Sequence, residues 1–417
     1  MATNKSKQKS IKGDNQIVLK IKETDYDRFL RDRKWAKEFI LAEYKKNPQL
    51  FPKDFESFTF NGTNSKSRKM QIKKRQLLVH GVYYQIHPSF VLQDMREKVS
   101  DEIQKGLSLC AHGTPYWLVV MCFGRNEAYW YRLSQSFSRN SIVGTTVYSE
   151  PSNIPKHILV DEKHIKVQKS KRYIATTIGN GCYLGAEIAK KADETELTGS
   201  YSVFKEEATE LDSEYCPKTI NTDGWQATLN AMASLFPLAV LIRCFLHAFL
   251  KIRTEAKRKF KEEFDLCADF VWDCYRAKGK RSFSQRIRRL KEWAKANMKS
   301  YKMKEAVLKL CKRKNEFVCF FDNPDAHRTS NMLDRLMKFM DRKIFKAQGF
   351  HGSFEAANAA MRSFALLHNF APSCPASRKD GYKSPAERLN KLAFSDNWVE
   401  NLLIASSMNG KRKNTVL

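Results

Sequence analysis

The sequence predicts an α/β protein in which a mixed sheet is flanked by helices, with a helical insertion and a mostly helical N-terminal region. Three observations support this fold class. The hydrophobic pattern changes from a helical period to a strand-like one near residue 157. Asn180-Gly181 lies between two strand-like runs and is a strong hairpin signal. Further on, Cys267, Val271 and Cys274 recur at helical spacing.

Turn signals and composition divide the chain into segments. A polar, basic start predicts disorder, and a stretch containing Gly144, Pro151 and Pro155 predicts a linker ahead of the sheet. The predicted segments are a disordered basic tail (1–15), an N-terminal DNA-binding region (16–138), a linker (139–156), a sheet domain in two pieces (157–248 and 313–370), a helical insertion between those pieces (249–312), and a C-terminal segment (371–417).

The N-terminal region contains two short helical patterns, 116–122 and 127–137, joined by a turn at Gly124. Thr114 is the expected N-cap of the first helix, with Pro115 at its first position. Such a pair can form a helix-turn-helix, whose second helix reads the major groove of DNA. The alternative is a plain helical bundle with its aromatic side chains in the core. In the first case the reading side chains include Arg125, Arg132 and Gln135.

The sheet domain is predicted to run through three antiparallel strands, a helix, a strand, a helix and a strand. The expected strands are 157–167, 172–178, 183–188, 219–222 and 238–243, and the expected helices are 202–211 and 225–235.

The charge balance indicates the class of partner. The 417 residues include 74 Lys and Arg against 45 Asp and Glu, a formal net charge of +29. An excess of this size favours a polyanionic partner, with nucleic acid first and an anionic membrane surface second. The sequence has neither a long uncharged apolar run nor a secretory signal, so we expect no membrane span. Ten cysteines without a CxxC pair favour reduced thiols in the cytoplasm.

Two aspartates follow apolar strand-like runs. Asp161 comes after 157–160, and Asp223 comes after 219–222. If these strands are neighbours, both carboxylates point to one spot, and Mg²⁺ prefers such hard oxygen ligands. Two ions about 4 Å apart can promote phosphodiester transfer. The alternative is that each aspartate is only a turn former or a helix cap.

Three segments in a fixed order carry a family resemblance. They are Val160-Asp161-Glu162, then Thr222-Asp223-Gly224 followed by Cys244-Phe245-Leu246-His247, and then Thr329-Ser330-Asn331-Met332-Leu333-Asp334-Arg335. Together they resemble the catalytic region of DDE-type transposases, the RNase H-like enzymes of bacterial insertion sequences, and look closest to the Mutator-type branch.

The resemblance implies an RNase H-like catalytic domain with Asp161, Asp223 and Asp334 as catalytic residues and metal ligands. They would hold two Mg²⁺ ions, for which Mn²⁺ would substitute. The implied activity is cleavage at transposon ends and strand transfer into target DNA, by a nucleoid-associated homodimer or larger synaptic complex. The family has Glu where this chain has Asp334, so Glu316 and the acidic residues of the following loop remain alternative third ligands.

Cys244 and His247 match a Cys-x-x-His that the branch places after the second acidic residue. This pair is too little for a zinc site, which needs four ligands. We expect a packed structural pair near the acidic residues, with His247 contacting DNA or orienting Asp223.

Basic residues on two predicted helices are candidate contacts to the DNA backbone, since Lys and Arg neutralise phosphates without reading sequence. They are Arg286 and Arg289 in the insertion, and Lys338 and Arg342 beyond Asp334. The alternative is a solvated helix face. Two other functions stay open as well: a domesticated, non-catalytic DNA-binding protein, and an RNase H-like nuclease or resolvase without strand transfer.

Overall fold

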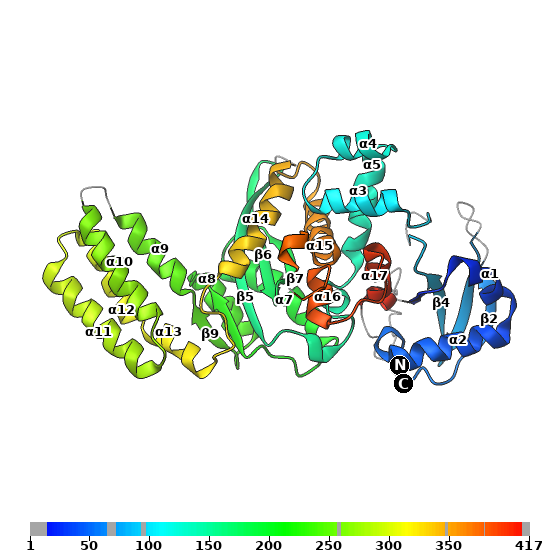
Figure 1. Cartoon of the computed structure of the whole chain (residues 1–417), viewed down its shortest axis with the longest axis horizontal. Coiled ribbons are helices and arrows are strands. Elements are labelled where there is room, and N and C mark those ends of the chain that lie inside the picture. The colour runs from blue at the N-terminus through cyan, green and yellow to red at the C-terminus, as the bar shows by residue number, and fades with distance from the viewer. Residues whose placement is uncertain are drawn as a thin grey trace, which may run out of the picture.

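A computed structural model of the protein describes residues 15–64, 72–92, 97–256, 260–346, 349–378 and 380–410. The α/β class is confirmed, because the chain forms two mixed sheets, of four and five strands, together with many helices. The four-stranded sheet lies at one end, the five-stranded sheet in the middle and a helical bundle at the other end (Figure 1). Apart from Asn15, the predicted disordered tail falls outside the described residues. Within them, no helix is long and apolar enough to span a membrane.

The N-terminal region contains a sheet that the sequence did not predict. Its strands are β1 (Gln16–Leu19), β2 (Thr59–Asn64), β3 (Lys74–Val79) and β4 (Val82–Pro88), in the order β1-β4-β3-β2, and two helices, α1 (Glu23–Arg31) and α2 (Arg33–Lys46), accompany them. β1 pairs with β4 in parallel, although most of the region separates them in sequence. Buried side chains such as Phe29, Leu77 and Ile86 form the core beneath this sheet.

Three helices follow, α3 (Asp101–Ala111), α4 (Tyr116–Phe123) and α5 (Glu127–Gln135), and α4 and α5 lie close to their predicted positions. Pro115 occupies the N-cap of α4, where we expected Thr114. Trp130 of α5 is fully buried, and a Cβ on Gly106 would lie 2.3 Å from its ring. α5 also packs on α15 (Phe354–Phe370) of the central domain. Through these contacts the three helices pack against the central domain.

The segment 139–156 is not the linker that we predicted. It forms a short helix, α6 (Ile142–Thr146), and every residue from Asn140 to Ser149 is buried. Gly144 serves close packing here, since a Cβ at this position would lie 1.6 Å from the carbonyl oxygen of Gly410. Gly144, which the sequence places in a linker, therefore packs tightly against the C-terminal segment.

The central sheet has the order β7-β6-β5-β8-β9. Its strands are β5 (His157–Val167), β6 (Ser170–Gly179), β7 (Cys182–Ala189), β8 (Thr219–Thr222) and β9 (Val240–Arg243). β5, β6 and β7 are antiparallel, whereas β5, β8 and β9 are parallel to one another. Asn180 and Gly181 both have positive φ, as the predicted hairpin turn requires. β5, which contains Asp161, and β8, which ends just before Asp223, are neighbours.

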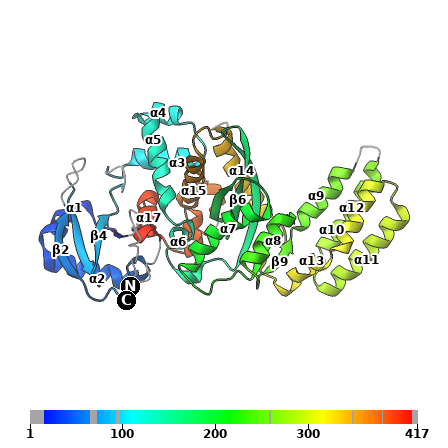
Figure 2. The same ribbon diagram turned by 180° about the vertical axis from the view of Figure 1, so that it is seen from behind.

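Helices cover both faces of this sheet (Figure 2). On one face, α7 (Glu194–Thr209) and α8 (Gln226–Leu235) enclose a core that includes Val160 and Leu184. On the other face, α14 (Asn331–Lys346) and α15 enclose a core that includes Leu159 and Tyr183. Because side chains alternate along β5, Val160 packs on the face covered by α7 and α8, and Leu159 packs on the face covered by α14 and α15.

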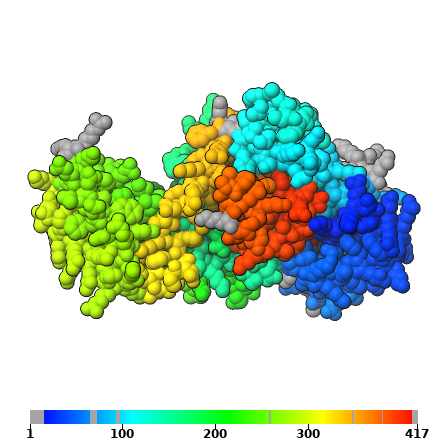
Figure 3. All heavy atoms as spheres, viewed as in Figure 1, coloured from blue at the N-terminus to red at the C-terminus, as the bar shows by residue number. Residues whose placement is uncertain are grey.

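The helical insertion begins at Phe245, earlier than predicted. It consists of α9 (Phe245–Glu255), α10 (Lys261–Tyr275), α11 (Lys280–Asn297), α12 (Tyr301–Lys312) and α13 (Asn315–Val318), around a core of its own. The C-terminal helices α16 (Pro385–Asn390) and α17 (Trp398–Ala405) follow, α16 against β7 and α15, and α17 against β1. Their atoms, orange to red in Figure 3, adjoin the blue atoms of the N-terminal region. There the Ser407 hydroxyl accepts a hydrogen bond from the backbone N–H of Val18 and donates one to the carbonyl of Leu50.

Candidate metal centre

Three side chains from distant parts of the chain converge beside β5. One ligand atom each of Asp161, His247 and Asp334 lies within 4.8 Å of the other two, and all three residues are half-buried. Asp161 belongs to β5, His247 to the first turn of α9, and Asp334 to the first turn of α14. Two carboxylates and an imidazole at this separation form a set of ligands that a divalent cation can use.

Asp223 stands apart from this group, although its strand is next to β5. It follows β8 directly, and its carboxylate accepts a hydrogen bond of 2.7 Å from the backbone N–H of Trp225, at the start of α8. Its charge still acts on Asp161, whose pKa it raises. The structure thus brings two of the three predicted carboxylates together with His247, and places Asp223 on the neighbouring strand end with its side chain turned to the α8 backbone.

The turn after Asp223 depends on glycine. Gly224 has a φ of +87°, and a Cβ there would lie 2.0 Å from Nη1 of Arg243. The guanidinium of Arg243 donates a hydrogen bond of 3.2 Å to the carbonyl of Gly224 and also pairs with Glu316. This contact fixes the path of the backbone that carries Asp223.

The electrostatics of Asp161 are unusual for a carboxylate. Burial, followed by the charges of Asp223 and Glu162, raises the pKa of Asp161 to about 7, while the N–H of Glu162 and the charge of His247 lower it. Among the described ion pairs, none links a lysine or arginine to Asp161, Asp223 or Asp334. A buried acidic group without a lysine or arginine partner is costly in the folded protein, and a bound metal ion would relieve that cost.

Ser330 connects the remaining groups and was missed as a functional residue in the sequence. Its hydroxyl donates a hydrogen bond of 3.2 Å to Asp334, lies 3.3 Å from Nδ1 of His247 and accepts a hydrogen bond of 3.3 Å from the Cys244 thiol. Hydrogen bonding to Cys244 raises the pKa of His247 to about 9, burial opposes this, and the nearby acidic charges add to it. Cys244 is fully buried and belongs to the packing behind the site.

Glu162, next to Asp161, was also given no role by the sequence. Because side chains alternate along β5, it lies on the opposite face, where it accepts hydrogen bonds from Tyr201 (2.7 Å) and Thr228 (2.8 Å). Burial, chiefly, raises its pKa. Glu162 therefore ties β5 to α7 and α8, and this fixes the strand that carries Asp161.

Two of the alternative third ligands, Glu316 and Asp322, lie in ion pairs elsewhere, and the third, Asp325, is not in the group around Asp161 either. Glu316 pairs with Arg243 and with Arg313, at 3.8 Å in the second case, and Asp322 pairs with Lys280 at 2.5 Å. Neither residue belongs to the group around Asp161. Of the carboxylates considered for the third position, Asp334 is the one that lies against Asp161.

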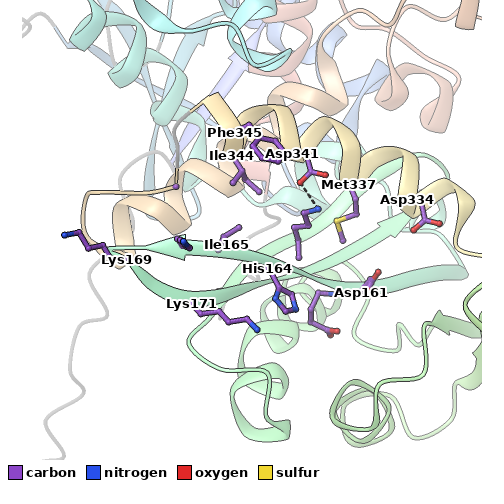
Figure 4. Close-up of a pocket in the computed structure, with 14 residues that line it drawn as sticks. Asp161, His164, Ile165, Lys169, Lys171, Asp334, Met337, Asp341, Ile344 and Phe345 are labelled. Carbon is purple, nitrogen blue, oxygen red and sulfur yellow. Dashed lines mark hydrogen bonds and ion pairs between the residues drawn. The ribbon is translucent and has the colours of Figure 1, made fainter. Parts of the chain in front are cut away.

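A groove of about 810 Å³ runs from Asp161 and Asp334 between β5 and α14 (Figure 4). Lys163 and Asp341 form an ion pair of 2.6 Å across it, and Lys169 lies toward its far end, near the β5–β6 turn. The groove is also lined by Lys166 and Lys171, and by apolar side chains from α14. Lysines thus lie toward the β5–β6 turn, and the carboxylates of Asp161 and Asp334 lie at the opposite end of the groove.

The predicted DNA-binding residues fall in several separate places. Lys338 and Arg342 are exposed on α14 and do not line the groove, and Arg289 is exposed on α11, far from the centre. Arg286 donates a hydrogen bond to the carbonyl of Asp273. In the N-terminal region Arg132 is exposed, Arg125 pairs with Glu97, and Gln135 is half-buried in a second cavity. The structure thus does not gather these side chains into one surface.

The chain matches no protein-family model, and no curated protein matches it either.

Proposed function

We propose that this protein is a DDE-type DNA transposase that cleaves transposon ends and joins them to target DNA. The observation that carries the proposal is the convergence of Asp161 and Asp334 on one point, with Asp223 at the end of the adjacent strand. The order of the central sheet, three antiparallel strands followed by two parallel ones, supports an RNase H-like catalytic domain. The net charge of +29 supports DNA as the partner.

The residues present fit the two Mg²⁺ ions that this function needs. The carboxylates of Asp161 and Asp334 are hard oxygen donors, and His247 adds a nitrogen that Mn²⁺ accepts more readily than Mg²⁺. Asp161 and Asp334 would hold one ion, and a second would take Asp161 and, once its carboxylate turns from the Trp225 N–H, Asp223. When bound, the ions would activate the attacking oxygen and stabilise the leaving oxygen.

The other residues position the reactants. Lys166, Lys169 and Lys171 of the groove neutralise phosphates and hold one strand along β5. Ser330 fixes the Asp334 carboxylate and the His247 ring. Water first attacks the phosphodiester at the transposon end, and the released 3′-hydroxyl then attacks the target strand. Catalysis thus depends on placing these groups in line, with no covalent protein intermediate. We expect the nucleoid as the site of action, and a homodimer or larger synaptic complex as the active form.

The test uses the purified full chain with labelled DNA taken from the regions that flank its coding sequence. With Mg²⁺ or Mn²⁺ the wild type should release the labelled end and produce strand-transfer products. Asp161→Asn and Asp223→Asn should bind the same DNA and leave it uncut. Full cleavage by either variant would overturn the assignment. Cleavage without joined products would instead identify a nuclease or resolvase, and binding alone a non-catalytic protein.

The third ligand needs a test of its own. Asp334→Asn should abolish cleavage, because this side chain lies against Asp161. Glu316→Gln should retain cleavage, because Glu316 pairs with Arg243 away from the group. If Glu316→Gln abolishes cleavage and Asp334→Asn retains it, Glu316 is the third ligand.

A further inference from the structure

A small pocket of about 90 Å³ lies between Asp223 and the helical insertion. Its walls come largely from α9 and α12, which pack against each other. Ala248 and Lys251 lie one turn apart on α9, and Lys309 and Arg313 lie one turn apart at the end of α12. Because side chains three or four positions apart share one face of a helix, each helix turns a single face to the pocket.

The wall of this pocket carries more positive than negative charge. One carboxylate, that of Asp223, is set against four basic side chains, which are those of Arg243, Lys251, Lys309 and Arg313. The two arginines share Glu316 as an ion-pair partner. The two lysines are exposed, and in the part of the chain that the structure describes neither of them forms an ion pair. Like charges on one wall repel each other, and an anion in the pocket would offset that cost.

The rest of the wall is apolar, and the space that it encloses is small. Leu310 and Phe317, both buried, line the pocket together with Ala248 and Ala306. A volume of about 90 Å³ is that of about three water molecules, which leaves room for one compact oxyanion. Water screens charges less beside apolar side chains, so an ammonium group attracts an anion more strongly there than on an open surface. The pocket therefore suits a single phosphate group.

Asp223 places this pocket beside the candidate metal centre. It lines the pocket, and its strand β8 pairs with β5, which carries Asp161. The charge of Asp223 acts on Asp161, so the two carboxylates lie near each other. A phosphate in the pocket would thus lie next to Asp223 on the side of the helical insertion, whereas the groove lysines lie toward the β5–β6 turn.

We propose that this pocket holds one backbone phosphate of the bound DNA, with Lys251 and Lys309 neutralising its charge. The inference rests on the proposed function, because DNA supplies the phosphate. Each backbone phosphate carries one negative charge and accepts strong hydrogen bonds from ammonium groups. The helical insertion then positions the strand beside Asp223. A free phosphate ion has the same chemistry, so the experiment alters the DNA as well as the protein.

The probe is the labelled DNA that flanks the coding sequence, with one phosphate at a time replaced by a neutral methylphosphonate. Binding to the full chain is measured in the presence of a chelator, so that it does not depend on metal ions. Replacement of a contacted phosphate should weaken binding about tenfold. The double variant Lys251→Ala/Lys309→Ala should lose this effect at one position and keep it at the others. The slope of its log binding constant against log salt concentration should be smaller by about 1.

The matched control is Lys291→Ala/Lys295→Ala, because both lysines are exposed on α11 and line neither the groove nor the pocket. This variant should keep the effect of every methylphosphonate. Lys251 and Lys309 are exposed as well, so their replacement should leave thermal unfolding unchanged.

The outcomes separate the two proposals. If Lys251→Ala/Lys309→Ala keeps the effect of every methylphosphonate, or if the control loses the same one, the pocket proposal is wrong and the transposase proposal stands. A pocket that takes only free phosphate gives the first of these results. If the wild type does not bind the DNA at all, the proposed function fails and the pocket proposal fails with it.

Discussion

Two groups of carboxylates in the central domain differ in what surrounds them. Glu187 of β7 and Glu207 of α7 both pair with Arg362 of α15, and all three side chains are 15% exposed or less. Arg362 also donates hydrogen bonds of 3.0 Å to the carbonyls of Ser138 and Asn140. Burial lowers the pKa of Arg362, but the two carboxylates outweigh this and raise it, so the guanidinium stays charged.

The group at Asp161 has no such partner. Its nearest cationic group is the ring of His247, and the pKa of Asp161 is raised to about 7. The cluster with an arginine joins a strand, two helices and a loop, which is a structural role. The cluster without an arginine sets the carboxylates of Asp161 and Asp334 against the single ring of His247, and such an excess of acidic groups is expected of a site that holds an external cation. The presence of an arginine counter-ion is therefore what distinguishes the two clusters.

The largest expected effect is on activity, at the group without an arginine. Asp161→Asn should lower end cleavage at least about a thousandfold, because it removes a ligand shared by both proposed ions. The same change should raise the free energy of unfolding without metal, since it removes buried charge. Cleavage rates and urea unfolding measure both, with Asp322→Asn, in an exposed ion pair, as the control. If the Asp161→Asn variant cleaves DNA, or is less stable than the wild type, the Asp161 cluster has the same structural role as the Arg362 cluster.

The next effect is on stability, at the paired group. Arg362→Met should cost about 3–5 kcal/mol of unfolding free energy, because it leaves two buried carboxylates without their partner. Thermal or urea unfolding measures the loss. Arg288→Met is the matched control, since Arg288 pairs with Glu292 on an exposed helix face and should cost less than about 1 kcal/mol. Equal losses from the two variants would show that the cluster has no special structural role.

A pH series should sharpen the comparison. In the unfolded chain the Asp161 carboxyl loses its proton near its ordinary pKa of 3.8, whereas in the fold its pKa is about 7. Between these values the folded state binds the extra proton, so stability falls as pH rises, by about 1 kcal/mol per pH unit. The charges of Asp223 and Glu162 raise the pKa of this carboxyl, and the charge of His247 lowers it.

The measurement is urea unfolding at pH 5 and pH 7 in the presence of a chelator. The difference in stability between Asp161→Asn and the wild type should grow between these two values. Mn²⁺ should reduce that difference at pH 7, because it stabilises only the wild type strongly. A difference that stays constant with pH would show that Asp161 has an ordinary pKa.

The smallest expected effect is on metal affinity, at Ser330, which supports the candidate metal ligands. Ser330→Ala should weaken Mn²⁺ binding about tenfold, because its hydroxyl orients both Asp334 and His247. Calorimetric titration of the full chain measures this affinity. Thr228→Val is the control on the opposite face of β5, where it loses a hydrogen bond to Glu162. It should lower stability slightly and leave Mn²⁺ binding unchanged, and an equal loss of binding would show that the effect is not specific to Ser330.

The local signals in the sequence were sufficient for much of the central domain. β5 and β8 have the predicted bounds, and the Asn180-Gly181 turn lies where the dipeptide indicated, because hairpin turns and apolar runs are encoded locally. The N-terminal sheet was missed because its parallel β1–β4 pairing joins segments far apart in sequence. The predicted linker at Gly144 was wrong for a similar reason, because the residue that requires a glycine there, Gly410, lies far away in the sequence.

The candidate site was predictable only in part. Strand neighbours explain why Asp161 and Asp223 come near one another, but the turn that directs Asp223 toward Trp225 depends on side chains such as Arg243. The approach of Asp334 depends on how α14 lies over β5, which no local pattern encodes. Ser330 gave no signal of its own, because its role comes from three contacts that form only in the folded protein.

The contact between Ser407 and β1 has a consequence for how the protein is made. Val18 is synthesised 389 residues before its hydrogen-bond partner Ser407. Until α17 and the turn after it emerge, the first strand lacks the segment that packs against it. The residues of the helical bundle and of the central sheet are all synthesised before that segment. The contact that joins β1 to the C-terminal segment, however, cannot form until Ser407 has been synthesised.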